Sequence, residues 1–194
     1  MSELKTTIDW PAGYVARCPL FAGIDVGRER DLTVMWIDEQ IGDVAWTRAV
    51  LPLHAMPFPK QQRELEPWVK LTRRTAIDST GMGIALYDYL NEHCGGTVMG
   101  VNFAGSNDGG VKMKTDLAIR LKRNFEKSRN RIPYDPQIRT EFQAIKREAT
   151  ASGVKFDAPR IAQTSTSTRP RKRRPPLYLP SPMFRWASIE SRCA

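Results

Sequence analysis

Three extended segments follow one another in the first third of the chain, and this run constrains the fold more than any other feature. Residues 20–26 are apolar except for Asp25 and are followed by Gly27, residues 31–38 are rich in β-branched and aromatic side chains, and residues 43–53 follow a turn at Gly42. Because the connections between them are short, the three segments predict an antiparallel meander that opens the domain.

The middle of the chain alternates between helix and strand patterns. The predicted elements are a helix over 60–72, a strand over 75–78, a helix over 82–93 and a strand over 97–103. In the first of these helices, Leu65, Trp68 and Leu71 lie on one side, and Ser79 and Thr80 can cap the second helix. A strand, a helix and a strand in succession predict parallel pairing of the two strands.

Two more helices are predicted in the second half of the chain. The clearest amphipathic pattern covers residues 112–129, whose apolar positions recur every four residues: Met113, Leu117, Leu121 and Phe125. A helix over 135–150 is expected to bury Ile138, Phe142, Ile145 and Ala149, and a last strand is expected at 154–157. Taken in order, these elements predict an α/β fold with an RNase H-like mixed sheet and flanking helices.

The character of the chain changes after Arg160, where Ser, Thr, Pro and Arg replace the periodic patterns. We therefore expect a lead-in or linker over 1–19, a folded domain over 20–160 and a basic, disordered tail over 161–194. Residues 163–194 hold seven basic residues and one acid, so +6 of the net charge of +9 lies there and +3 remains for the rest. If the folded part binds nucleic acid, we therefore expect it to do so through local basic patches and not through its overall charge.

Nothing in the sequence predicts export or membrane insertion. There is no apolar run of eighteen residues, and the first residues lack the apolar core of a signal peptide. The three cysteines, Cys18, Cys94 and Cys193, are far apart and have no zinc-site spacing, which favours free thiols in a reducing compartment. The expected location is the cytoplasm.

Two aspartates stand at strand ends in this interpretation. Asp25 lies at the end of the first strand, and Asp78 ends the fourth, which is expected to pair with the first. Carboxylates on neighbouring central strands are suited to hold the divalent ions that phosphodiester hydrolysis uses. Each acid alone has a simpler interpretation: Asp25 as a turn-forming or phosphate-loop acid, and Asp78 as a cap of the following helix.

Around these acids the sequence resembles the nuclease domain of phage terminase large subunits, those of Mu-like prophages in particular. The resemblance rests on Phe21-Ala-Gly-Ile-Asp-Val-Gly and Arg74-Thr-Ala-Ile-Asp-Ser-Thr-Gly, and it covers about residues 9–160. It implies that Asp25 and Asp78 are catalytic ligands of a two-metal site for Mg²⁺ or Mn²⁺. The implied activity is a DNA endonuclease that cuts concatemeric double-stranded DNA during genome packaging in a bacterial host.

The sequence departs from that family in two ways. No GxxxxGK[ST] motif for ATP binding occurs, so DNA translocation is not expected of this chain. Its expected partners are a portal, a small terminase subunit or a separate ATPase chain. The family's third acid is also missing, since no Asp or His occurs from Gln163 onward. Asp157 or Asp31 could replace it, although a solvent-facing strand acid is the simpler interpretation of both. A replaced or frame-shifted terminus would explain the loss.

Basic residues mark one further candidate site. Lys112, Arg120, Arg123 and Lys127 recur at helical spacing and are expected to follow a DNA backbone, with a solvated helix face as the alternative. Two other functions stay open for the whole chain: a non-catalytic DNA-binding remnant, and a RuvC-like junction resolvase, which shares the Gly-Ile-Asp start. An actin-like ATPase is less favoured because the chain is too short for a second lobe.

Overall fold

The computed structural model describes residues 14–27, 32–107, 109–150 and 153–157. Within these ranges a six-stranded sheet has the order β5-β4-β1-β2-β3-β6. Its strands are β1 (Leu20–Asp25), β2 (Leu32–Ile41), β3 (Val44–His54), β4 (Arg74–Asp78), β5 (Val98–Val101) and β6 (Asn130–Arg131). The sheet therefore has β1 and β2 at its centre, and both are buried along most of their length.

The pairing of the strands confirms the predicted mixed sheet. β1, β2 and β3 form the antiparallel meander, because short turns connect them. β4 pairs with β1 and β5 pairs with β4, both in parallel, because a helix precedes each of these strands and carries the chain back to the same end. β6 extends the far edge in parallel with β3 and was not predicted from the sequence.

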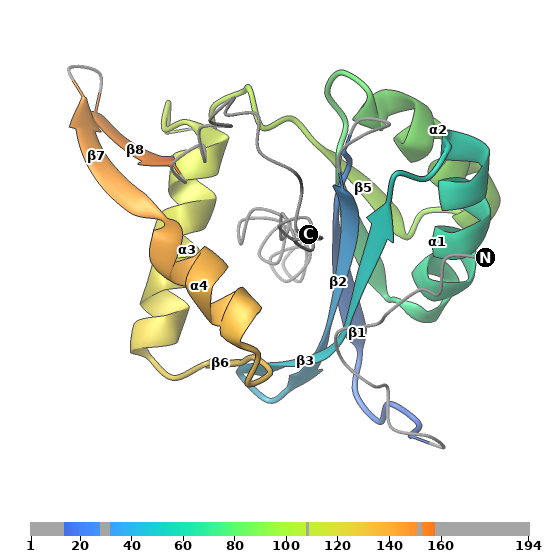
Figure 1. The fold of residues 1–194 in the computed structure, drawn as a ribbon, viewed down its shortest axis with the longest axis horizontal. Coiled ribbons are helices and arrows are strands. Elements are labelled where there is room, and N and C mark those ends of the chain that lie inside the picture. Colours follow the sequence, from blue (N-terminus) through green and yellow to red (C-terminus); the bar gives the residue numbers. More distant parts are fainter. Residues whose placement is uncertain (1–13, 28–31, 108, 151–152, 158–194) are drawn as a thin grey trace, which may run out of the picture.

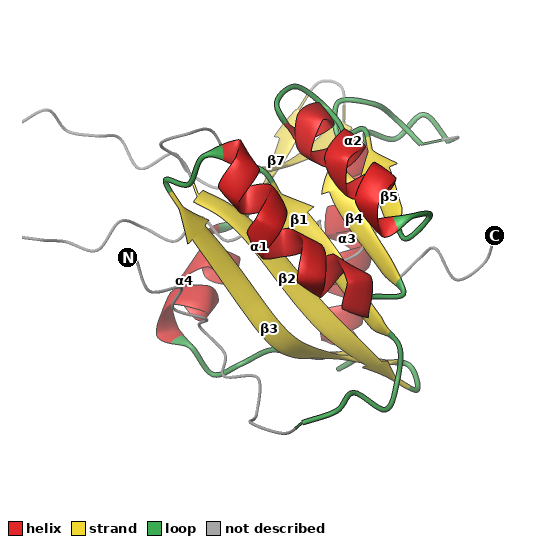
Figure 2. Ribbon diagram, turned by 90° about the vertical axis from the view of Figure 1, so that its right-hand side faces the viewer, coloured by secondary structure: helices red, strands yellow, loops and turns green. Residues whose placement is uncertain are grey.

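Helices cover both faces of the sheet, as the edge-on view in Figure 1 and the turned view in Figure 2 show. α1 (Phe58–Leu71) and α2 (Gly83–Cys94) lie on one face, and α3 (Met113–Glu126) and α4 (Pro136–Ala144) lie on the other. The hydrophobic clusters on the two faces show the same arrangement. Leu65 and Leu86 pack with Ile24 of β1, whereas Leu117 of α3 packs with Ala76 of β4. The structure is thus a three-layer α/β fold of the RNase H-like type.

The predicted helix over 135–150 is wrong in its second half. α4 ends at Ala144, and the next residues form β7 (Lys146–Thr150), which pairs in antiparallel register with β8 (Gly153–Asp157). Ile138 is buried as predicted, and Phe142 packs edge-on against Trp36. The strand predicted at 154–157 exists, but it belongs to this separate hairpin and not to the main sheet.

The structure adds one detail to the first helix and corrects the capping predicted for the second. Leu71 is 61% exposed, because it lies in the last turn of α1, and Val69 takes the core position instead. The N-terminus of α2 has Met82 as its N-cap residue and no side-chain capping hydrogen bond, so neither Ser79 nor Thr80 caps this helix. The apolar positions predicted for α3 are confirmed, with Leu117 and Leu121 buried.

A buried carboxylate holds the segment that leads into β1. Glu39 of β2 is 1% exposed and forms an ion pair with Arg48 Nε at 2.7 Å. It also accepts hydrogen bonds from the Tyr14 hydroxyl and from the backbone N–H groups of Arg17 and Cys18, the last two at 3.0 Å. Burial raises the pKa of Glu39, but the hydrogen bonds outweigh it and hold this pKa below its ordinary value.

The ends of the chain lie outside the described residues. These include residues 1–13 and 158–194, so the limits expected for the lead-in and for the basic tail stay predictions. Among the described helices, none is both long enough and apolar enough to cross a membrane.

Candidate active site

The strand register brings the two predicted acids to neighbouring positions. The parallel pairing of β1 with β4 runs from Phe21 opposite Arg74 to Ile24 opposite Ile77. Asp25 and Asp78 are the next and last residues of these two strands, so the register extended by one step places them side by side. Adjacent strands are about 4.8 Å apart, so these two residues are direct neighbours across the ladder.

Both acids belong to the face of the sheet that α3 and α4 cover. Asp25 is paired with Val34 and Asp78 with Val101, and residues opposite each other in a ladder share a face. Val34 packs in the core beneath Ile138 of α4, and Val101 packs in the core beneath α3. Asp25 and Asp78 are half-buried and follow the apolar part of each strand, where the chain leaves the sheet.

The turn after β4 fixes the carboxylate of Asp78. Its Oδ1 accepts hydrogen bonds from Thr80 N–H at 3.0 Å and from Thr80 Oγ1 at 2.6 Å. Since α2 begins only at Gly83 and its N-cap is Met82, Asp78 does not act as the helix cap that the sequence left open. Its partner is a hydroxyl two residues further along the chain, which strand and helix patterns do not reveal.

The end of β1 is tied to its other neighbour. Gly27 N–H donates to Thr33 Oγ1 at 3.0 Å, and Thr33 lies fully buried in β2. The backbone that follows Asp25 is therefore held against β2 although the pairing of the two strands has ended. Residues 28–31 lie outside the described part, and with them the candidate Asp31.

Two carboxylates on neighbouring strands offer the type of ligand that a divalent cation takes. Mg²⁺ takes oxygen ligands and is commonly held by one or two protein carboxylates, with water and phosphate oxygens in the other positions. The described residues contain no group of three or more His, Cys, Asp or Glu side chains placed to hold a metal ion. Asp157 ends β8, but its side chain is not described, so the structure does not test either candidate for a third ligand.

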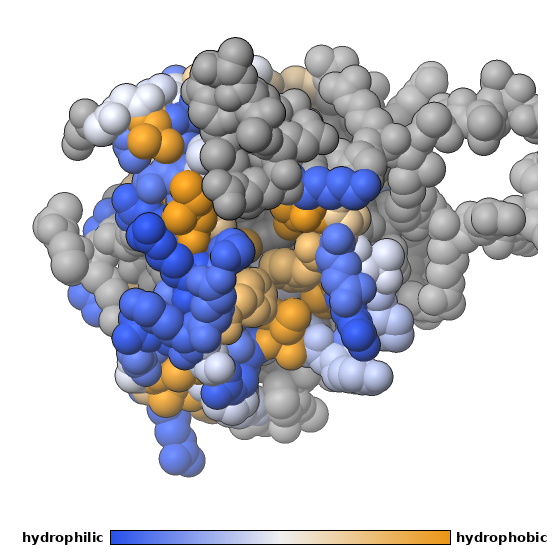
Figure 3. All heavy atoms as spheres, turned by 90° about the vertical axis from the view of Figure 1, so that its left-hand side faces the viewer, coloured by the Kyte–Doolittle hydropathy of each residue, from blue (hydrophilic) through white to orange (hydrophobic). Residues whose placement is uncertain are grey.

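The four predicted DNA-binding residues lie on or beside α3. Lys112 is the N-cap of this helix, and Arg120 forms an ion pair with Asp116 at 2.8 Å. Arg123 and Lys127 are exposed at the other end. Figure 3 looks onto the side that α3, α4 and the β7–β8 hairpin form, where hydrophilic residues gather around a smaller set of exposed apolar ones.

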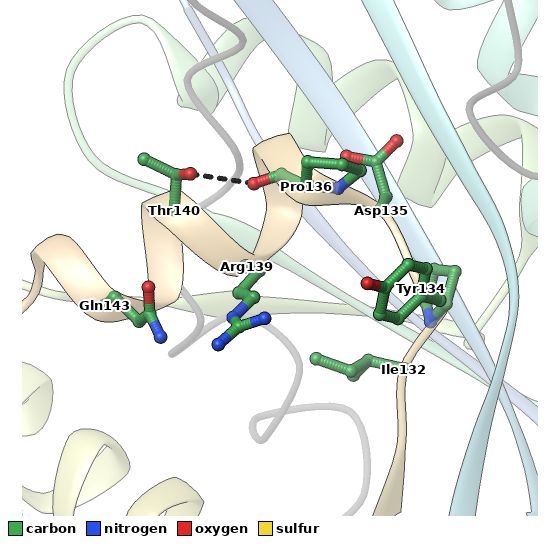
Figure 4. A pocket seen from close by; sticks show the side chains of 8 residues that line it. Ile132, Tyr134, Asp135, Pro136, Arg139, Thr140 and Gln143 are labelled. Atoms are coloured by element: carbon green, nitrogen blue, oxygen red, sulfur yellow. Dashed lines mark hydrogen bonds between the residues drawn. The ribbon is translucent and has the colours of Figure 1, made fainter.

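A pocket of about 400 Å³ lies elsewhere, at the start of α4 (Figure 4). Its lining includes Ile132, Pro133, Tyr134, Pro136, Arg139 and Gln143, and neither Asp25 nor Asp78 belongs to it. The nearby strand β6 pairs with β3 at Ala45 and Trp46, whereas Asp25 is opposite Val34 of β2. The pocket is therefore formed by the β6–α4 connection and the first turns of α4, and neither acid contributes to it.

Comparisons with known proteins agree on one fold. The large terminase nuclease from thermophilic phage G20c with bound magnesium is similar over 75% of each chain, with a TM-score of 0.61 and 19% identity. The nuclease domain of the Thermus phage P74-26 large terminase covers 75% of this chain and 72% of its own, with a TM-score of 0.59 and 17% identity. The P22 large terminase nuclease domain covers 74% and 75%, with a TM-score of 0.53 and 12% identity.

At these identities the structural likeness shows the fold alone. No curated protein sequence matches the chain. The sequence itself, however, matches the family model described as the terminase RNase H-like domain over residues 22–170, a stretch that includes most of β1 and every later element of the structure. The chain therefore belongs to the terminase RNase H-like domain family, as the motifs around Asp25 and Asp78 suggested.

Proposed function

We propose that this chain is a metal-dependent DNA endonuclease that cuts double-stranded, concatemeric phage DNA during genome packaging, with Asp25 and Asp78 as its catalytic metal ligands. The observation that carries the proposal is that Asp25 and Asp78 directly follow the paired residues Ile24 and Ile77 at the ends of neighbouring strands. The family assignment and the magnesium bound to the similar G20c nuclease support it.

The sheet supplies the rigidity that such a site needs. Asp25 and Asp78 stand on central strands that are paired on both sides, so neither backbone can move without breaking a ladder. Two carboxylates at this spacing repel each other, and a divalent cation between them removes that repulsion. Mg²⁺ or Mn²⁺ bound there would activate water and stabilise the charge that develops on the phosphate.

The expected extent of metal binding follows from the ligands present. Asp25 and Asp78 suffice for one ion that completes its shell with water and DNA phosphate oxygens. A second ion needs further oxygen ligands, for which Asp157 and Asp31 stay candidates. If neither serves, we expect one ion to bind well and cleavage to be slow.

Plasmid nicking in a titration with Mg²⁺ or Mn²⁺ tests the proposed activity. We expect the unchanged chain to nick supercoiled DNA and to stop when EDTA removes the metal. Asp25→Asn and Asp78→Asn should each slow nicking on the order of 100-fold or more, because each removes a direct ligand. Asp88→Asn, on α2 across the sheet, is the matched control and should leave the rate unchanged.

The outcomes separate the rival functions. Nicking that survives both aspartate substitutions would refute the assigned site. DNA binding without nicking at any metal concentration would favour the non-catalytic remnant, which the lack of a three-acid cluster in the described residues makes the main rival. A strong preference for branched over linear duplex DNA would favour a junction resolvase.

The exposed basic residues of α3 are proposed to contact the DNA backbone. The double variant Arg123→Ala/Lys127→Ala should weaken DNA binding and reduce the slope of log K against log salt by roughly 2, since each lost phosphate contact contributes about 0.9. Lys60→Ala, at an exposed position of α1 on the opposite face, should change neither quantity. An unchanged slope in the double variant would favour the solvated-face interpretation.

A further inference from the structure

Asp78 receives more hydrogen bonding than a tight turn requires. The bond from Thr80 N–H to Asp78 Oδ1 is the contact that closes an Asx-turn, and any residue except proline at position 80 could make it. The bond from Thr80 Oγ1 to the same oxygen, at 2.6 Å, is additional and needs a hydroxyl side chain. Among the described residues, both hydrogen bonds reach Oδ1 and none is recorded to Oδ2.

The position of Thr80 is itself fixed by the surrounding turn. Ser79 N–H donates to Val101 O at 3.1 Å, which ties the turn to β5, and Gly83 N–H donates to Thr80 O at 3.1 Å. α2 approaches so closely that a Cβ on Gly83 would lie 1.9 Å from the carbonyl oxygen of Asp78. Thr80 is therefore held on two sides and presents its hydroxyl to the carboxylate.

We infer that Thr80 is a positioning residue for Asp78, and this inference rests on the proposed metal-dependent function. Its hydroxyl keeps Oδ1 engaged and fixes the rotation of the carboxylate, which leaves Oδ2 as the oxygen for a divalent cation. Groups that hydrogen-bond a metal-ligating carboxylate orient it before the ion arrives, and their loss typically weakens metal affinity about 10- to 100-fold.

Mn²⁺ binding to the metal-free chain, measured by electron paramagnetic resonance and by calorimetry, tests this role without requiring cleavage. Thr80→Val removes the hydroxyl but keeps the shape and the backbone N–H, and we expect it to raise the Mn²⁺ dissociation constant about 10-fold or more. Thr80→Ser restores a hydroxyl at the same place and should bind Mn²⁺ nearly as well as the unchanged chain.

A second threonine provides the control for loss of a hydroxyl as such. Thr140 is exposed on α4, and its Oγ1 donates within the same helix to Pro136 O at 2.7 Å, so Thr140→Val should leave Mn²⁺ binding unchanged. If Thr80→Val binds Mn²⁺ as the unchanged chain does, or if Thr80→Ser loses as much affinity as Thr80→Val, the inference is overturned and the proposed function is not. If the unchanged chain binds no Mn²⁺, both are overturned together.

Discussion

Single residues determine how closely α2 packs against the end of β4. Gly83 begins this helix directly over the Asp78 carbonyl, and Gly100 of β5 is close to the side chains of Ser79 and Tyr87. At both positions a side chain would enter space that the turn after Asp78 already occupies. Glycine is therefore needed here for close approach, and the geometry of the acidic turn depends on it.

Replacement of Gly83 tests this close approach. Gly83→Ala should destabilise the fold by about 1–3 kcal/mol, because overpacking outweighs the gain in helix propensity. Thermal and urea unfolding followed by circular dichroism would measure the loss. Ile84→Ala, one residue further along and 47% exposed, should cost much less. Equal stabilities of the two variants would show that the turn after Asp78 shifts at little cost to accommodate a side chain at residue 83.

The pKa of Glu39 makes a second prediction at the scale of one residue. Because its folded-state pKa is depressed, the Glu39 carboxylate contributes stability above the unfolded-state value of about 4.3 and loses it as the pH falls through the folded-state value. Glu39→Gln should cost about 1–3 kcal/mol at pH 7.

The difference between Glu39→Gln and the unchanged chain should then shrink as the pH falls below about 4.3. Urea unfolding at a series of pH values would show this. Asp43→Asn, which removes an ion pair whose aspartate side chain is 67% exposed, should have little effect at any pH. A constant cost of Glu39→Gln across the acid range would contradict the role assigned to the Glu39 charge.

At the scale of elements, α3 and α4 pack on the sheet through a few apolar side chains. Leu117 and Leu121 of α3 meet Ala76 and Val101, and Phe142 of α4 lies edge-on to Phe125 with ring centres 5.3 Å apart. These contacts form the face on which Asp25 and Asp78 stand. The position of α3 relative to the acids therefore depends on a small core.

Truncation of that core should be costly. Leu121→Ala is expected to lower the free energy of unfolding by about 2–4 kcal/mol, because Leu121 is 5% exposed and its removal leaves a cavity. Lys122→Ala, on the exposed side of the same turn, should change it by less than about 0.5 kcal/mol. Denaturant unfolding distinguishes the two, and similar costs would mean that α3 is only loosely packed.

The elements also show what the sequence could and could not predict. The three-strand meander and the parallel strands were predictable because their patterns are local and their connections short. Residues 146–150 were predicted as helix because Ile145 and Ala149 continue, at intervals of three and four residues, the helical pattern of Ile138 and Phe142. Pairing with β8 overrides that pattern, and a local period contains no information about a partner strand.

The candidate site was predictable to a similar degree. Asp25 and Asp78 could be placed because each ends a recognisable strand and parallel strands end at the same edge. The hydrogen bonds of Thr80 could not, because a hydroxyl two residues from an acid can cap a helix, bind solvent or bind that acid. The choice depends on where α2 begins, and a start at Gly83 requires glycine because a Cβ there would lie 1.9 Å from the Asp78 carbonyl oxygen.

At the scale of the whole molecule, the two neighbouring acids are expected to lower the stability of the metal-free chain and to provide its metal binding. Asp78→Asn keeps an oxygen for the Thr80 bonds but removes one of two like charges, so the metal-free variant should be at least as stable as the unchanged chain. With Mn²⁺ at 100 times its dissociation constant, the unchanged chain should gain about 2.7 kcal/mol and the variant far less.

Thermal melts with and without Mn²⁺ measure both effects. Lys122→Ala, which lies outside the proposed site, should respond to Mn²⁺ as the unchanged chain does. A large fall in melting temperature for metal-free Asp78→Asn would instead mean that the carboxylate stabilises the fold itself.

The hydrogen bonds from Tyr14, Arg17 and Cys18 to Glu39 fix the segment that leads into β1. The backbone enters β1 at Leu20 and follows the whole strand, roughly 17 Å at about 3.3 Å per residue, before it reaches Asp25. A fluorophore, affinity tag or fusion partner attached upstream of Tyr14 therefore joins the molecule at the edge remote from the two acids. Such labels should leave access to Asp25 and Asp78 unobstructed.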